Sequence, residues 1–162
     1  MTTTDDGARQ MLRHTVATLA YRGGRALRGA PPEFAAFAAC PGARTPAQIL
    51  AHVGDLFDWA CGLADGRHVW GNSEPRAWGD EVARFFACLE RFDRRLGDGA
   101  PLGFPPEKLF QGPVADALTH VGQIAMLRRM AGAPIRGENY FKADIQAGRA
   151  GADQPPPKVE FD

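Results

Sequence analysis

The stretch TPAQILAHVGDLFDWACGLA, residues 45–64, decides the fold class of this chain. Thr45 followed by Pro46 is a typical helix start, because a hydroxyl can cap free backbone N–H groups and proline suits the first helical position. Gln48 stands three residues after Thr45 and can complete a capping box. Apolar side chains then recur at spacings of three and four, and they are Ile49, Val53, Leu56, Trp59, Ala60 and Leu63. The stretch therefore predicts an amphipathic helix with one buried face.

Three further segments have the same helical period. The first runs to about Leu27 from a cap at Asp5 or Asp6, and the others cover about residues 80–96 and 113–130. Glycine and proline separate the segments. Shorter helical pieces are expected at residues 105–110 and 138–148.

Four such segments predict an all-α protein with the architecture of a four-helix bundle. The connections between the second and third segments and between the third and fourth are longer than ten residues. Connections of that length permit crossovers instead of simple hairpins. We expect a single domain over residues 1–150 and an extended tail over residues 151–162, which is rich in proline.

Charge and hydropathy exclude several classes of function. Lys plus Arg total 19 and Asp plus Glu total 19, so the formal net charge is zero. Nucleic acids and anionic membranes attract a basic excess, so neither is expected as a partner. No apolar run approaches the roughly 18 residues of a membrane-spanning helix. The first ten residues, MTTTDDGARQ, lack the pattern of a secretion signal, so we expect a cytoplasmic protein.

Two histidines lie on helix faces that are otherwise apolar. His52 belongs to the second segment and His120 to the fourth, where Asp116 precedes it by four residues. Residues four apart share one face of a helix, so Asp116 and His120 can present an oxygen and a nitrogen to one point. Two histidines and a carboxylate can bind one divalent metal ion (Zn, Ni, Mn or Fe) and leave positions open for water or substrate.

Each of these residues also has a purely structural interpretation. His52 can be a neutral core histidine that forms a hydrogen bond with a neighbour. Asp116 can interact with the free N–H groups in the first turn of its helix. Because Asp-x3-His pairs often arise by chance, spacing alone leaves both interpretations open.

Three nearby residues can support a site or belong to the core. Asp55 follows His52 by three residues and can orient it or supply a further oxygen ligand. Trp59 lies on the same face as His52 and can form the wall of a substrate pocket or pack in the core. Gln123 follows His120 by three residues and can hold the second nitrogen of that ligand, or it can form an interhelical hydrogen bond.

Two stretches resemble the signature segments of the DinB/YfiT-like superfamily, whose members are four-helix bundles proposed to be metalloenzymes. The stretches are TPAQILAHVGDL and DALTHVGQIAMLRRMAG, residues 45–56 and 116–132. The family takes one histidine from its second helix and two from a His-x3-His pair ahead of Gly-Gln. His52 matches the isolated histidine, and His120 matches the second of the pair. Asp116 stands where the first is usual, a position at which the similarly folded mycothiol-dependent maleylpyruvate isomerases have glutamate.

The resemblance implies a function as well as a fold. It implies a divalent metal ion held by His52, Asp116 and His120, a small-molecule substrate and a homodimer. The best-known activity is S-transfer or isomerisation with a low-molecular-weight thiol as cofactor, and a related hydrolase is a further possibility. Two alternatives remain: a non-enzymatic protein that binds a metal or small molecule, with a role in stress, and a structural domain whose polar trio is satisfied internally.

Overall fold

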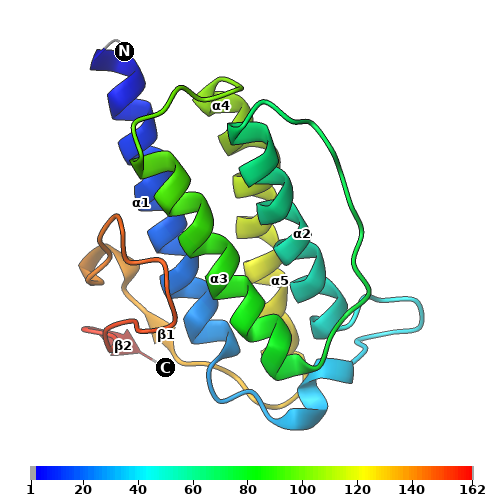
Figure 1. The fold of residues 1–162 in the computed structure, drawn as a ribbon. Helices are drawn as coiled ribbons and strands as arrows, with labels where there is room; N and C mark the ends of the chain where they lie inside the picture. Colours follow the sequence, from blue (N-terminus) through cyan, green and yellow to red (C-terminus); the bar gives the residue numbers. More distant parts are fainter. Residues whose placement is uncertain (1–2, 162) are drawn as a thin grey trace.

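The computed structural model describes residues 3–161, and four long helices form most of it (Figure 1). They are α1 (Thr3–Leu27), α2 (Pro46–Ala64), α3 (Trp78–Gly97) and α5 (Ala115–Met130). The shorter elements are the 3-10 turns η1 (Pro32–Ala36) and η3 (Tyr140–Lys142), α4 (Pro106–Leu109), the π-helical turn η2 (Phe110–Val114), and the strands β1 (Gly137–Glu138) and β2 (Glu160–Phe161). The predicted all-α class is confirmed.

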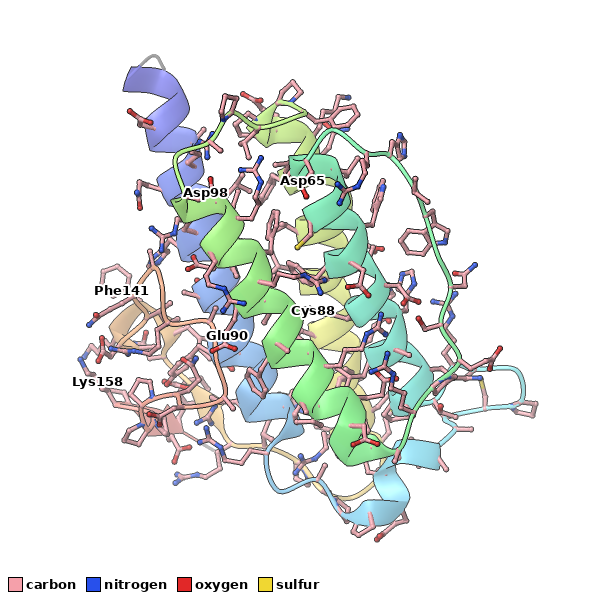
Figure 2. The ribbon with its side chains drawn as sticks, in the orientation of Figure 1. Asp65, Cys88, Glu90, Asp98, Phe141 and Lys158 are labelled. Atoms are coloured by element: carbon pink, nitrogen blue, oxygen red, sulfur yellow. The ribbon has the colours of Figure 1, made fainter. Side chains whose placement is uncertain are left out.

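The long helices lie side by side, with α1 and α2 each packed against both α3 and α5. Residues 65–77 return along the length of α2 before α3 begins, so α2 and α3 run parallel (Figure 1). Asp65, just after α2, and Asp98, just after α3, lie at the same end of the molecule (Figure 2). Arg95 contacts both, Asp65 at 2.7 Å and Asp98 at 3.1 Å. Residues 98–105 instead join α3 to α4 at one end of the molecule, so this connection is not a crossover.

The predicted start of α2 is confirmed. The Thr45 hydroxyl accepts a hydrogen bond from the Gln48 backbone N–H at 3.3 Å, and the Gln48 side chain accepts one from the Thr45 N–H at 2.9 Å. The predicted start of α1 is wrong by at least three residues, because a cap at Asp5 would make residue 6 the first helical residue and the helix already includes Thr3. Acidic residues favour the first turn of a helix as well as its cap, so their position alone does not identify the first helical residue.

The helix predicted for residues 138–148 is also wrong. Glu138 pairs with Glu160 in an antiparallel ladder between β1 and β2, and only the short turn η3 follows. Tyr21 of α1 donates a hydrogen bond to the buried Glu138 at 2.5 Å, and Arg25 contacts the same carboxylate at 3.1 Å. These long-range contacts hold the segment in an extended conformation against α1.

Apolar side chains from all four long helices form one core between them. Its fully buried members include Val16, Leu19, Val53, Phe57, Leu89, Phe92, Ala117 and Ile124. Among the described residues, no helix has both the length and the apolar character that crossing a membrane requires. The core positions α2 and α5 side by side, and the candidate site lies between these two helices.

Candidate metal centre

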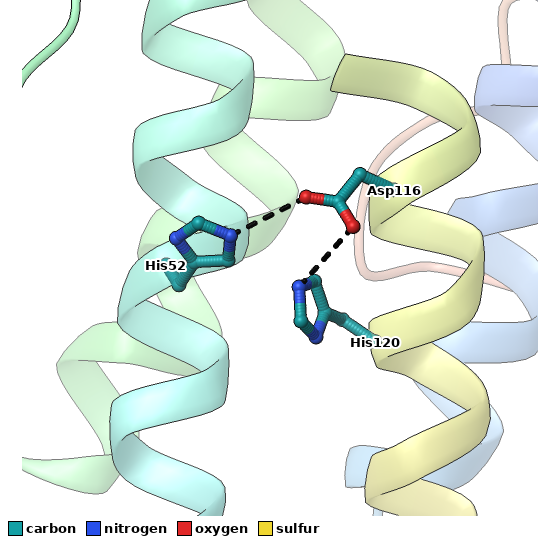
Figure 3. A group of neighbouring side chains, drawn as sticks. All are labelled: His52, Asp116 and His120. Carbon is teal, nitrogen blue, oxygen red and sulfur yellow. Dashed lines mark hydrogen bonds and ion pairs between the residues drawn. The ribbon is translucent and has the colours of Figure 1, made fainter. Parts of the chain in front are cut away.

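Three polar side chains converge where α2 faces α5 (Figure 3). His52 Nε2 lies 3.4 Å from Asp116 Oδ2, and His120 Nε2 lies 3.4 Å from Asp116 Oδ1. One candidate ligand atom from each residue lies within 4.8 Å of the other two. Within residues 3–161, no other group of three or more His, Cys, Asp or Glu side chains meets that spacing. The structure therefore brings together the trio that the sequence singles out.

The spacing within the trio is compatible with a metal ion as well as with hydrogen bonds, and the two contacts of 3.4 Å use different oxygens of Asp116. A distance of 3.4 Å is long for a hydrogen bond between nitrogen and oxygen. Two ligand atoms that are each about 2.1 Å from a tetrahedral ion are about 3.4 Å apart. Imidazole nitrogen and carboxylate oxygen suit Zn, Ni and Fe, and three protein ligands leave at least one coordination position free. The residues present thus fit one divalent ion.

The electrostatic setting of His52 favours the neutral imidazole that coordination needs. Burial lowers the pKa of His52, and electrostatic interactions with His120 and Arg44 act in the same direction. The interaction with Asp116 opposes this shift without reversing it. At neutral pH His52 therefore has a lone pair available for a metal ion.

Gln123 contacts His120, one of the two interactions that the sequence analysis considers for it. Its side-chain oxygen lies 2.7 Å from Nδ1 of His120. An oxygen acceptor at this position favours a ring proton on Nδ1, and Nε2 is directed at Asp116. The hydrogen bond thereby favours the tautomer that can bind a metal ion through Nε2.

Gln123→Ala is expected to weaken Zn²⁺ binding by about 10- to 100-fold, because ligand histidines lose affinity when their outer partner is removed. Competition with a chromophoric chelator measures the affinity. Gln10→Ala, at an exposed position on α1, is the matched control. An unchanged affinity in Gln123→Ala would assign this glutamine a structural role only.

The other two predicted neighbours have different surroundings. The Trp59 ring packs against Trp70 with centroids 5.6 Å apart, and Trp70 packs against His52 at the same separation. These two indoles wall one side of the trio. Asp55 lies outside the trio: it accepts hydrogen bonds from the backbone N–H of Ser73 at 2.8 Å, from the Ser73 hydroxyl at 2.7 Å and from Arg84 at 2.7 Å. Asp55 thus anchors the 65–77 segment over α2 and does not complete the ligand set.

A π-helical turn orients the α5 side of the site, a feature that the sequence analysis does not predict. Residues 110–114 form this wider turn directly before Ala115 begins α5. One extra residue in a turn rotates everything after it by about 100° relative to a continuous α-helix. The signal available in the sequence is Pro113, since a proline inside a helix has no N–H for the regular hydrogen bond. The turn therefore helps to decide which face of α5 presents Asp116 and His120 to α2.

Two cavities flank the trio. The larger, of about 470 Å³, is lined by Arg44, Ile49, His120, Gln123, Met126 and Leu127. The smaller, of about 210 Å³, is lined by Arg44, Gln48, His52, Asp55, Asn72, Ser73, Glu74 and Pro75. A small molecule in either cavity would lie beside one of the two histidines.

No family model, curated protein or solved structure matches this chain significantly. The geometry of His52, Asp116 and His120 therefore carries the functional interpretation. What this geometry offers chemically is a neutral nitrogen from each of two helices, a carboxylate between them and space on both sides.

Proposed function

We propose that this protein is a metal-dependent enzyme of the DinB-like superfamily, a four-helix bundle in which His52, Asp116 and His120 hold one divalent ion. The observation that carries the proposal is the convergence of two histidines and one carboxylate, from two helices, with one candidate ligand atom of each within 4.8 Å of the other two. The short signature motifs around His52 and His120 agree with it. The reaction class we propose is transfer involving a low-molecular-weight thiol.

Each residue has a defined task in this proposal. When bound, a divalent ion in such a site lowers the pKa of a thiol or water ligand and so supplies a nucleophile near neutral pH. His52 contributes a neutral nitrogen because its surroundings lower its pKa. Gln123 keeps the Nε2 lone pair of His120 directed at the site. Trp70 packs against His52 and Trp59 packs against Trp70, so these two rings restrict the position of His52.

Metal content tests the first half of the proposal. Wild-type protein loaded with Zn²⁺, Ni²⁺ or Mn²⁺ and then desalted is expected to retain about one equivalent by ICP mass spectrometry, because the three ligands are preorganised. His52→Ala is expected to retain almost none. His14→Ala, at an exposed position on α1, is the matched control and should behave as wild type. Wild-type protein without metal after loading would contradict the metal centre.

Turnover tests the second half. The metal-loaded protein is incubated with cysteine, glutathione or mycothiol and the electrophile monochlorobimane, and formation of the fluorescent thioether is followed. We expect a rate above the uncatalysed reaction that disappears when the metal is removed with a chelator. Stoichiometric metal without any such rate would favour the non-enzymatic binding protein.

We also propose a homodimer, which the resemblance implies. Met11 and Phe110 are 66% and 46% exposed, and together with Leu12 and Pro106 they line an apolar pocket away from the trio. Exposed apolar side chains that gather in this way are common at subunit interfaces. Size-exclusion chromatography with light scattering is expected to give twice the chain mass, and a species of 17.5 kDa would contradict the dimer.

A further inference from the structure

Arg44 lies at the candidate site with its guanidinium unused. It directly precedes the Thr45 cap of α2, and it is the one residue that lines both cavities beside the trio. Its charge also reaches His52, where it contributes to the lowered pKa. No other residue within 3–161 forms a hydrogen bond or ion pair with the Arg44 side chain. Its five N–H donors are therefore available to a ligand.

By contrast, two arginines of α3 are paired with carboxylates. Arg84 contacts Asp55 and Asp58 at 2.7 and 2.6 Å, and Arg95 contacts Asp65 at 2.7 Å. A guanidinium that stays unpaired beside a cavity is well placed to bind a carboxylate, since its planar fork matches the two carboxylate oxygens.

The larger cavity adds an apolar surface to this charge. Ile49, Met126 and Leu127 line it, and no acidic side chain does. Its volume of about 470 Å³ lies within the range of small-molecule pockets. The smaller cavity instead contains Asp55 and Glu74, whose negative charges disfavour an anion. An anionic ligand is therefore expected in the larger cavity.

We infer that the site takes a small organic anion, a carboxylate with a short apolar chain, and that Arg44 is the residue that recognises its charge. The apolar chain lies against Ile49, Met126 and Leu127, which removes apolar surface from water. His120 lines the same cavity, so the bound molecule lies beside a proposed metal ligand. The inference rests on the proposed function in this respect, because it names the substrate class of that same site.

Hexanoate is the probe, and hexanamide is its uncharged counterpart. Both are titrated into the protein, once metal-free and once loaded with Zn²⁺, with the methionine methyl groups labelled with ¹³C. Hexanoate is expected to shift the signal of Met126, which lines the cavity, and to leave that of Met11, which lines a different pocket. Hexanamide is expected to bind at least about tenfold more weakly than hexanoate, because it has no charge for the guanidinium.

Arg44→Gln is expected to weaken hexanoate binding about tenfold and to leave hexanamide binding unchanged. Arg94→Gln, at an exposed position on α3, is the matched control and should bind both probes as wild type does. Equal hexanoate affinity in wild type and Arg44→Gln, or a shift of Met11 without one of Met126, would overturn the inference.

The two proposals fail in different ways. If Zn²⁺ binds but no Arg44-dependent shift of Met126 appears, the anion site is wrong and the metal centre stands. If Zn²⁺ does not bind but hexanoate still shifts Met126 in an Arg44-dependent way, the anion site stands and the metal centre is wrong.

Discussion

Replacing Asp116 with alanine is expected to lower the Zn²⁺ affinity by more than about 100-fold. This loss exceeds the roughly 10- to 100-fold expected for Gln123→Ala, because Asp116 would contact the ion directly and Gln123 would only hold a ligand histidine. Asp116 lies between the two histidines, 3.4 Å from each Nε2, and it is the only anionic side chain of the trio. Its removal leaves two neutral imidazoles on different helices, which cannot offset the ion's lost hydration to the same degree. Competition with a chromophoric chelator measures the affinity of wild type and variant.

Two further variants separate loss of the ligand from general damage. Asp116→His places an imidazole where the DinB-like family usually has one, and it is expected to bind Zn²⁺ far more tightly than Asp116→Ala. Asp80→Ala removes an exposed acid of α3 and should leave the affinity unchanged. The Asp116 side chain is 45% exposed, so its loss should not unfold the protein, and circular dichroism verifies this. Wild-type affinity in Asp116→Ala would mean that the ion is held elsewhere.

The parts of the site that follow from helical periodicity could be predicted from the sequence. Asp116 and His120 are four residues apart, so a single helix brings them together whatever surrounds it. His52 stands out by the same logic, as a polar residue on an apolar face. That His52 meets the other two depends on packing between α2 and α5, and the sequence suggested this only through the resemblance.

The remaining features depend on contacts between distant parts of the chain. The path of residues 65–77 along α2 is held by Ser73 on Asp55 and by Trp70 on Trp59, and no local pattern specifies these pairs. No sequence pattern distinguishes Arg44 from other loop arginines, because its position between two cavities depends on the folded structure. Asp55 was predicted beside His52 from its position on the helix, but the side chain of Arg84 from α3 decides its hydrogen bonds.

Arg84→Ala is the second change for which a large effect is expected, this time on stability. The Arg84 side chain is 7% exposed and contacts Asp55, itself 6% exposed, at 2.7 Å. Removing the guanidinium leaves the Asp55 carboxylate buried without its counter-charge, which costs about 3–5 kcal/mol of unfolding free energy. Arg84 also lies 3.8 Å from the fully buried Glu81, which adds a second buried acid to this loss, whereas Asp58 is 46% exposed and can regain water. Urea denaturation of the metal-free protein at pH 7 measures the difference, with Arg94→Ala as the exposed control.

The pH dependence of this loss tests whether it comes from the carboxylates that face Arg84, which are Asp55, Asp58 and Glu81. Burial raises the pKa of Asp55, but the hydrogen bonds from Arg84 and Ser73 and the charge of Arg84 outweigh burial, so the pKa lies below its usual value. A depressed pKa stabilises the folded protein above the unfolded-state pKa of about 3.9, and this contribution disappears as the pH falls through the folded-state value. The gap between wild type and Arg84→Ala should therefore be widest near neutral pH and narrow in acid, where Asp55 becomes protonated. A gap that stays constant from pH 7 to pH 3 would mean that Arg84 stabilises the protein through packing and its bond to the Ala51 carbonyl, and not through the carboxylates that face it.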